Sequence, residues 1–487
     1  MSEFKHKIKE WEINNKKFKS PTIFPRIRTI EEYSIFNDLN KKFGLKHMGG
    51  YVVNSYRLPS VFPGIPPNKK QKLLIKQRTD KKVLIIDPCI DKLFSSSNKE
   101  LKDFYKLKEL FPKSKHIFTK IKIILDYYKQ TENLEKLKKN KSKREQQAID
   151  RNIHGIKSDI NANKVNENDI NMAFYEEVFR LQDHFLSDNI TIPSLPISYQ
   201  MNKNDMDNCF RVTSNAVNLA NTLYPDTKKM LILNLRKNAL LRGANIPTEK
   251  EKKFDISDKY DLFPKDFLSM VEDALPEREK IWGSVLRMNE FTKLNVDSIG
   301  IKIFDYHFDP ISEIVLVYFT SYLRELIDEK YLHFFDMDET FYALFSRGAD
   351  SYSGPVSTIP FMMRSISGVP KEGNWYHPVD KLFYPRNRDA INLYDMQKEE
   401  KYKIPCPCKI CEAYVTFKKI EEDAEEKTKI SGKELKTEFN KLWNEYRRRH
   451  WFCYKDLEME ELQRDDTRLI KEEIARSKRQ DLHSFFQ

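Results

Sequence analysis

Two short apolar runs, Ser298-Ile-Gly-Ile-Lys-Ile303 and Tyr331-Leu-His-Phe-Phe335, stand on either side of a helical stretch. Strand-like runs that alternate with helical segments indicate a parallel sheet, because parallel strands need long crossover connections. The same alternation recurs at Tyr51–Val53, Val83–Ile86, Ile190–Ile192, Met230–Leu233 and Gly348–Tyr352, and we expect one more strand between His116 and Leu125. About eight such units predict an α/β fold, a closed (β/α)8 TIM barrel with inserted helices.

The chain of 487 residues is long enough for one barrel with additional segments. We expect an N-terminal extension over 1–45, the barrel over 46–400 and a zinc-binding helical subdomain over 401–487. A polar segment at about 131–168 is rich in Lys and Arg and reads as a basic insertion in the barrel. The insertion either contacts phosphates or forms a solvated charged face.

The chain carries a net charge of +12 and has a pI near 9.0. A basic protein suits a polyanionic partner, because binding releases condensed counterions, but charge does not separate DNA from RNA. Many of the lysines could instead reflect the base composition of the genome. No apolar run reaches 18 residues, and the first residues are charged, so we expect a soluble cytoplasmic protein with no membrane contact.

A cysteine cluster, Cys406-Pro-Cys408-Lys-Ile-Cys411, lies near the C-terminus and holds three of the six cysteines. Such close spacing provides thiolate ligands for tetrahedral Zn²⁺, which needs four ligands in a structural site. His450 is the expected fourth ligand, and Cys453, three residues later, is the alternative. The sequence therefore predicts a structural zinc site and a reducing compartment rather than a set of disulfides.

The order of these features resembles that of the tRNA-guanine transglycosylase superfamily, and within it the phage and bacterial DNA-guanine transglycosylases. Three segments carry the resemblance: Asn295 to Ile303 with its glycine, Phe341 to Ser353 with its Gly-x-Asp, and the cysteine cluster with His450. The resemblance implies a TIM barrel with structural zinc. The implied reaction replaces guanine in DNA with a 7-deazaguanine base; tRNA is the alternative substrate, and a homodimer or a partner subunit is a further possibility.

That reaction needs one carboxylate to attack the anomeric carbon of the sugar and a second to take a proton from the incoming base. Asp87 ends an apolar run and matches the first aspartate of the family pattern, although Pro88-Cys89-Ile90 follows in place of Ser-Gly-Gly. The family's nucleophile position is occupied by Ser353, so Asp350 is the predicted nucleophile. A turn or capping role is the structural alternative for both aspartates.

The resemblance also implies that Gly300 lies beneath the bound base. Asp305, after the Gly300 strand, is expected at the barrel mouth, where it either contacts the base or sugar or is a polar loop residue. Arg364 either contacts phosphate or pairs with surface carboxylates, and Ser353 and Ser194 complete the predicted substrate-binding set. Ser194 stands where the family usually has an aspartate that reads the base. Because Ser194 and Ser353 both replace carboxylates, a non-catalytic nucleic-acid-binding subunit remains a competing hypothesis. A zinc-containing nucleic-acid-binding protein of another fold is the third.

Overall fold

A computed structural model describes the chain over 8–62, 81–89, 142, 145–151, 167–197, 201, 203–241, 275–304, 310–337, 341–356, 375–376, 383–384 and 433–464. The strands are β1 Lys9–Ile13, β2 Lys16–Ser20, β3 Thr22–Ile23, β4 Arg26–Ile27, β5 Gly50–Asn54, β6 Val83–Asp87, β7 Ile190–Pro193, β8 Lys229–Arg236, β9 Ser298–Phe304, β10 Tyr331–Phe335, β11 Ser351–Tyr352, β12 Trp375–Tyr376 and β13 Phe383–Tyr384. The helices are α1 Ile30–Phe43, the 3-10 turn η1 Ser55–Arg57, α2 Leu58–Val61, α8 Glu167–His184, α9 Lys203–Leu223, α10 Lys237–Leu241, α13 Leu275–Lys280, the π-helix η3 Ile281–Val285, α14 Met288–Phe291, α15 Pro310–Ile327, α16 Phe341–Ser346 and α21 Lys433–Gln463.

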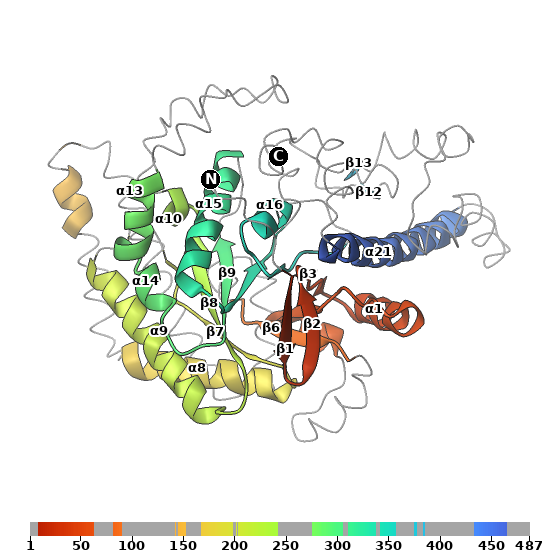
Figure 1. Cartoon of the computed structure of the whole chain (residues 1–487), viewed down its shortest axis with the longest axis horizontal. Coiled ribbons are helices and arrows are strands. Elements are labelled where there is room, and N and C mark those ends of the chain that lie inside the picture. The colour runs from red at the N-terminus through yellow and green to blue at the C-terminus, as the bar shows by residue number, and fades with distance from the viewer. Residues whose placement is uncertain are drawn as a thin grey trace.

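Parallel strands form the centre of the molecule (Figure 1). One sheet has six strands in the order β3-β11-β10-β9-β8-β7, and a second has three in the order β4-β5-β6. Every strand pair in these two sheets is parallel. The predicted α/β class is therefore confirmed, and seven predicted runs correspond to β5 through β11.

Two sheet strands were absent from the sequence prediction. β3 and β4 fall inside the predicted N-terminal extension, yet β3 pairs with β11 and β4 pairs with β5. Each has only two residues, which is too short for a recognisable apolar period. The predicted strand between His116 and Leu125 and most of the basic insertion lie outside the described residues.

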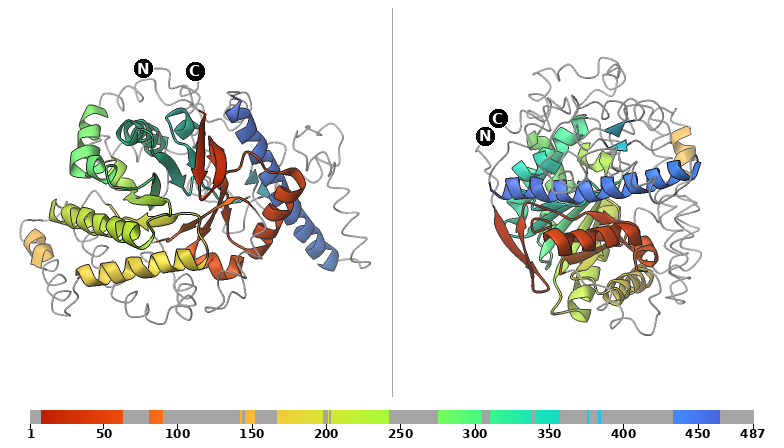
Figure 2. Two further views of the ribbon diagram at one scale, coloured as in Figure 1. Left: turned by 60° about the horizontal axis from the view of Figure 1, so that its bottom comes forward. Right: turned by 90° about the vertical axis from the view of Figure 1, so that its right-hand side faces the viewer.

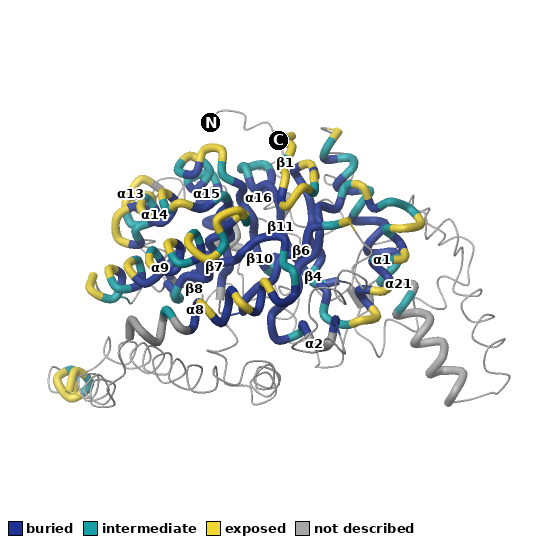
Figure 3. The backbone as a smooth tube through the Cα atoms, turned by 90° about the horizontal axis from the view of Figure 1, so that it is seen from below, coloured by how far each residue is buried: buried dark blue, intermediate teal, exposed yellow. Residues whose placement is uncertain are grey.

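Helices pack on the outer face of the strands, and their buried sides face the sheet (Figures 1 and 3). In α9 the buried residues recur at helical spacing, at Met206, Cys209, Val212, Thr213, Ala216, Val217 and Ala220. This spacing gives one apolar stripe that packs against the sheet. None of the helices in the described part is long and apolar enough to cross a membrane.

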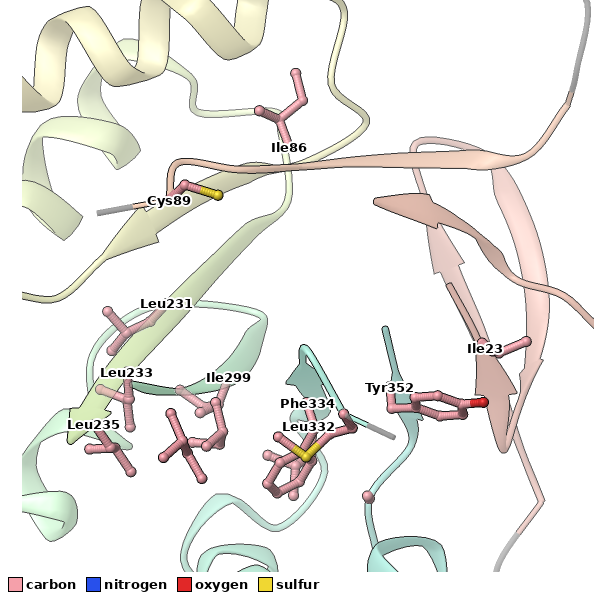
Figure 4. Close-up of a cluster of buried hydrophobic side chains, with 14 of the residues drawn as sticks. Ile23, Ile86, Cys89, Leu231, Leu233, Leu235, Ile299, Leu332, Phe334 and Tyr352 are labelled. Atoms are coloured by element: carbon pink, nitrogen blue, oxygen red, sulfur yellow. The ribbon is translucent and has the colours of Figure 1, made fainter. Parts of the chain in front are cut away.

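Alternate residues of each strand enter two different hydrophobic cores. On β8, Leu231, Leu233 and Leu235 join the outer core beneath the helices (Figure 4). Met230 and Ile232 point the opposite way, into a smaller inner core. The inner core contains residues of both sheets, namely Phe24, Val52, Val83, Ile85, Met230, Ile232, Tyr331 and Phe335, together with Ile13 and Phe18. The two sheets therefore face each other across shared side chains.

The β1–β2 hairpin covers the amino ends of the strands. Its turn residues Asn14 and Asn15 have φ of 48° and 62°, which is the geometry of a tight two-residue hairpin turn. Asn14 Nδ2 lies 3.0 Å from Asp188 Oδ1, and Lys16 Nζ lies 2.7 Å from Asp188 Oδ2. Trp11 packs edge-on against Tyr331, the first residue of β10, with ring centroids 4.9 Å apart. This end of the sheets is closed by side chains.

Helix α21 lies beside α1, far from it in sequence (Figure 2). Phe452 of α21 and Phe36 of α1 have ring centroids 5.5 Å apart. Asp456 Oδ1 accepts hydrogen bonds from the backbone N–H groups of His47 and Met48 at 2.8 and 3.1 Å. The C-terminal helix is therefore fixed to the segment that leads into β5.

Candidate functional site

A buried ion pair joins the carboxyl ends of β6 and β9. Lys302 Nζ lies 2.6 Å from Asp87 Oδ2, and each side chain is 2% exposed. Side chains two residues apart on a strand point to the same face. On β6, Asp87 follows Val83 and Ile85 of the inner core at this spacing. On β9, Lys302 follows Ser298 and Gly300 in the same way, so the side chains of Asp87 and Lys302 both point inward. The strand geometry thus places one ammonium and one carboxylate above the apolar inner core.

The carboxylate of Asp87 is held in its charged form. Burial raises the pKa of Asp87, but the charge and hydrogen bond of Lys302, the Cys89 N–H and the charge of Arg26 together bring the pKa below its ordinary value. The Cys89 N–H donates to Asp87 Oδ1 at 2.9 Å. Cys89 has a φ of 53°, and its Sγ lies 3.6 Å from Lys302 Nζ.

A second carboxylate, Asp336, lies against the same ammonium. Asp336 directly follows β10 with a φ of 65°, and its Oδ2 lies 3.8 Å from Lys302 Nζ. Its side chain is 27% exposed, whereas that of Lys302 is 2% exposed. Asp336 also pairs with Arg26, the first residue of β4. The cluster therefore has a buried carboxylate, Asp87, and one that solvent reaches, Asp336.

Polar residues extend this cluster along the carboxyl ends of the strands. Asn54 is opposite Asp87 in the β5–β6 register, and Asn234 is opposite Lys302 in the β8–β9 register. Asn234 donates to the Ser194 carbonyl at 2.8 Å. The interior between the sheets thus changes from apolar at the amino ends to polar at the carboxyl ends, where parallel α/β folds place their ligands.

His333 is a neutral residue beneath the cluster. Its ring is fully buried between Phe24 and Phe335, with centroids 5.6 and 4.4 Å away. Burial, opposed in part by the charge of Asp87, lowers the pKa of His333 to about 3. His333 Nδ1 lies 2.6 Å from Ser351 Oγ. His333 therefore packs as an uncharged side chain and gives the cluster no proton at neutral pH.

Two predicted serine positions lie near the cluster and have structural partners. Ser353 Oγ accepts the Asp336 N–H at 3.4 Å, and the Ser353 carbonyl accepts the Met337 N–H at 2.9 Å. Ser194 Oγ donates to the Leu195 carbonyl and accepts from Asn234 N–H, both at 2.9 Å. Ser353 therefore stabilises the turn that carries Asp336, and Ser194 links β7 to β8 through hydrogen bonds.

Gly300 lies on the inner face of β9 beneath Phe335. A Cβ atom at Gly300 would come within 2.7 Å of the Phe335 ring, so the ring fills the space that a side chain would need. The role of Gly300 beneath a bound base stays a prediction. Gly300 allows β9 and the Phe335 side chain to approach closely.

Asp350 does not join the Asp87 cluster. The sequence interpretation put it in a strand spanning Gly348–Tyr352, but β11 begins at Ser351, so Asp350 precedes the strand and lies at its amino end. Asp350 Oδ2 lies 2.5 Å from Arg324 Nη2 and accepts the Leu332 N–H at 2.8 Å. Burial raises the pKa of Asp350 despite Arg324. Asp87 and Asp350 are therefore at opposite ends of the sheets.

Some of the remaining predicted site residues lie in the described part of the chain, and others lie outside it. Asp305, Arg364, Cys406, Cys408 and Cys411 lie outside the described residues. His450 lies in α21, fully buried, with its ring stacked on Tyr454 at 5.6 Å, and Cys453 is buried one turn later. Within the described ranges, no three His, Cys, Asp or Glu side chains gather as a metal site. The zinc ligand set stays a prediction.

Sequence reasoning missed Lys302, Asp336 and Arg26. Two signals were available. Lys302 is a charged residue within the apolar run from Ser298 to Ile303, and Asp336 follows the run Tyr331–Phe335 just as Asp87 follows Val83–Ile86. The role of Arg26 depends on a two-residue strand and on contacts over 300 residues away in sequence, so no local pattern marks it.

Comparison with protein-family models gives no match to this chain, and comparison with curated protein sequences gives none either.

Proposed function

We propose that the protein is a nucleic-acid guanine transglycosylase that exchanges guanine in DNA for a 7-deazaguanine base, with tRNA as the alternative substrate. The observation that carries this proposal is the pair of carboxylates, Asp87 and Asp336, on either side of Lys302 at the carboxyl ends of parallel strands. Base exchange by double displacement needs two carboxylates in one site. The net charge of +12 supports a polyanionic substrate.

The two carboxylates suit different steps. Asp336 is the more exposed and can reach a sugar: its oxygen forms an ester bond to the anomeric carbon as the glycosidic bond to guanine breaks, and the departing base takes up a proton from solvent water. Asp87 is ionised and can accept the proton that the incoming base loses when it displaces Asp336. Lys302 stabilises the negative charge of both carboxylates before the ester forms, and that of Asp87 alone while Asp336 is esterified. Asp350 is too far along the sheet to share this chemistry with Asp87.

We further propose that the two sheets are parts of one closed (β/α)8 barrel. Residues 22–27 carry β3 in one sheet and β4 in the other, so this segment and β5 through β11 supply eight strand positions. Isolated bridges join Ile23 to Met48 and Arg26 to Pro355. Between β6 and β7, the Asp188 N–H donates to the Leu84 carbonyl at 3.0 Å and Thr191 Oγ1 donates to the Ile86 carbonyl at 2.7 Å. The shared inner core supports the same closure.

A structural zinc ion is part of this proposal. Cys406, Cys408 and Cys411 supply three thiolates, and α21 offers either the His450 imidazole or the Cys453 thiol, both buried and one helical turn apart. Bound zinc would tie the cysteine cluster to α21. No step of the proposed reaction involves the metal.

The test is retention of radiolabelled guanine by duplex DNA and, separately, by tRNA. Label in either polymer supports base exchange and identifies the substrate. Asp336→Asn should abolish both exchange and a denaturation-resistant protein–nucleic acid adduct, and Asp87→Asn should slow exchange strongly. Asp207→Asn, a matched change of a surface carboxylate, should leave exchange unchanged. Loss of the adduct in Asp350→Asn but not in Asp336→Asn would overturn the assigned roles.

The second candidate function is a non-catalytic nucleic-acid-binding subunit. Ser194 and Ser353 have only structural hydrogen bonds among the described contacts, and Phe335 fills the space beside Gly300. A folded, zinc-loaded protein that binds DNA or tRNA but never incorporates label would favour this function over base exchange.

A further inference from the structure

Arg26 is the first residue of β4, and its side chain points into the interior between the two sheets. Phe24 belongs to the inner core and Ile27 to the outer core, so Arg26, two residues after Phe24, shares the inward direction. The Arg26 N–H donates to the Gly354 carbonyl at 2.8 Å, which fixes the backbone at this point. The side chain is 15% exposed, so solvent reaches it.

The two oxygens of Asp336 face different cations. Oδ1 pairs with Arg26, and Oδ2 lies 3.8 Å from Lys302 Nζ. A carboxylate with one cation at each oxygen cannot rotate freely, because rotation would break both charge-assisted contacts. Arg26 comes from the three-stranded sheet and Lys302 from the six-stranded sheet. The orientation of Asp336 therefore depends on residues from both sheets.

Arg26 also balances the charge of the cluster. Lys302 lies between two carboxylates, Asp87 and Asp336. Two carboxylates in one site repel each other, and with a single cation one of them keeps its proton to a higher pH. Arg26 supplies the second positive charge: it pairs with Asp336, and its charge helps to lower the pKa of Asp87. A guanidinium does not lose its proton at physiological pH.

The other ionisable groups beside the two carboxylates do not supply this charge. Cys89 donates its backbone N–H to Asp87, and its Sγ lies 3.6 Å from Lys302 Nζ. His333 has a pKa lowered to about 3, so its ring is neutral at neutral pH. Within the described ranges, the cations in contact with the two carboxylates are Arg26 and Lys302.

We propose that Arg26 is a positioning residue of the reaction, which orients Asp336 and keeps Asp336 and Asp87 ionised at the same time. This role rests on the proposed base exchange. Asp336 gives an electron pair to the anomeric carbon and becomes a neutral ester, while the departing guanine takes the electrons of the glycosidic bond and a proton from water. Displacement by the incoming base returns the electron pair to Asp336, which pairs with Arg26 again, and Asp87 accepts the proton of that base.

The experiment measures guanine exchange by the full-length wild type, Arg26→Met and Arg26→Lys from about pH 5 to pH 8. Exchange needs both carboxylates ionised, so the rate falls at the acid end. Arg26→Met should move this acid limb to higher pH by about one unit or more, because loss of a nearby cation favours the protonated carboxyl group. Arg26→Lys keeps the charge, so its acid limb should stay near that of the wild type. Should Arg26→Met fail to fold, Arg26→Gln takes its place with the same expected shift.

Arg287→Met is the matched control. Arg287 also pairs with two carboxylates, Asp207 and Glu290, but these are 48% and 46% exposed and lie outside the cluster. The control should leave the acid limb where it is. If Arg26→Met lowers the rate by the same factor at every pH, Arg26 is a structural residue and the proposal is wrong.

A second measurement separates the role of Arg26 from the proposed function, because unfolding needs no base exchange. Without Arg26, one carboxyl group has a higher pKa in the folded protein than in the unfolded chain. The stability linked to that group is present at low pH and is lost as pH rises. The loss of stability in Arg26→Met should therefore be larger at pH 7 than at pH 5. Equal losses would overturn the role of Arg26 whether or not the wild type exchanges guanine. A wild type that exchanges no guanine at any pH, with the unequal losses observed, would overturn the proposed function and leave Arg26 as the residue that keeps both carboxylates ionised.

Discussion

Arg324 Nη2 lies 2.5 Å from Asp350 Oδ2, and the same guanidinium donates to the carbonyls of Gly348, Asp328 and Lys330. One side chain thus holds the end of α15, the turn before β10 and the entry to β11 together. The Arg324 and Asp350 side chains are 13% and 5% exposed, so water hardly screens the pair. Arg324 and the Leu332 N–H thus hold the Asp350 carboxylate in place.

Arg324→Met should destabilise the protein by about 3–5 kcal/mol, because it leaves Asp350 buried without its counter-charge. The double variant Arg324→Met, Asp350→Leu should recover much of that loss, since no unpaired ion remains. Denaturant unfolding of both single variants and the double variant gives the coupling energy. Purely additive losses would contradict an interaction between these two residues.

Lys302→Met should also destabilise the protein, and the loss should depend on pH. In the wild type the lowered pKa of Asp87 gives stability above its unfolded value of 3.8 that is lost as pH falls through the folded pKa. Without Lys302, burial raises the pKa of Asp87 and penalises the charged form. We expect a loss of about 3–5 kcal/mol at pH 7 and a smaller loss at pH 5.

Unfolding midpoints of the wild type, Lys302→Met and Lys302→Met with Asp87→Asn measure this effect. The double variant has no buried carboxylate at position 87 and should show the smaller dependence on pH. An equal loss for Lys302→Met at both pH values would argue against control of Asp87 by Lys302.

His333 should make the protein sensitive to mild acid. Its pKa is lowered from 6.5 to about 3, so the folded protein binds this proton more weakly than the unfolded chain. The stability from neutral His333 is complete above pH 6.5 and decreases as pH falls towards 3. Between pH 6.5 and 5 the decrease should be about 2 kcal/mol.

His333→Gln removes the titrating ring and should flatten this part of the stability profile. The comparison is between the slopes of the two proteins against pH, so a constant cost of the substitution does not matter. Parallel slopes for the wild type and His333→Gln would refute the assignment.

Gly300→Ala should destabilise the inner core by about 1–3 kcal/mol, because the new methyl group meets the Phe335 ring. Phe335→Leu in the same chain should relieve the clash and reduce the loss. Thermal unfolding of the two single variants and the double variant tests this. A Gly300→Ala protein as stable as the wild type would show that Phe335 does not fix this position.

Cys408→Ala should release zinc and destabilise the C-terminal part of the chain, because a structural zinc site loses much of its binding free energy with one ligand. Metal analysis of the purified protein should give one zinc per chain for the wild type and much less for the variant. His450→Ala and Cys453→Ala then identify the fourth ligand. A Cys408→Ala protein with full zinc content and an unchanged melting temperature would refute the site.

The long apolar strands could be predicted from sequence because their residues are buried on both faces. Runs such as Met230–Leu233 need no knowledge of distant contacts, and they gave the α/β class and the position of Asp87. β3 and β4 could not be predicted, because two residues carry no periodicity and their pairing depends on strands far along the chain.

The candidate site was predicted only in part. Asp87 follows a strong strand signal, whereas Asp350 was misplaced because the start of β11 was set three residues too early. The first residue of a strand is harder to predict than the presence of the strand. An error of three residues shifts the expected position of a side chain by about 10 Å along the sheet. Lys302 and Asp336 are adjacent only through the β9–β10 pairing, which the sequence does not specify locally.

The pairing of β3 with β11 has a consequence for synthesis of the chain. Thr22 and Ile23 leave the ribosome more than 300 residues before their partners Ser351 and Tyr352. Until β10 and β11 emerge, β3 lacks its partner strand, and Phe18 and Phe24 lack their ring contacts with Tyr331 and His333. A nascent chain in this state exposes apolar surface and an unpaired strand edge. We expect the ribosome-bound protein to need chaperone protection until β11 emerges.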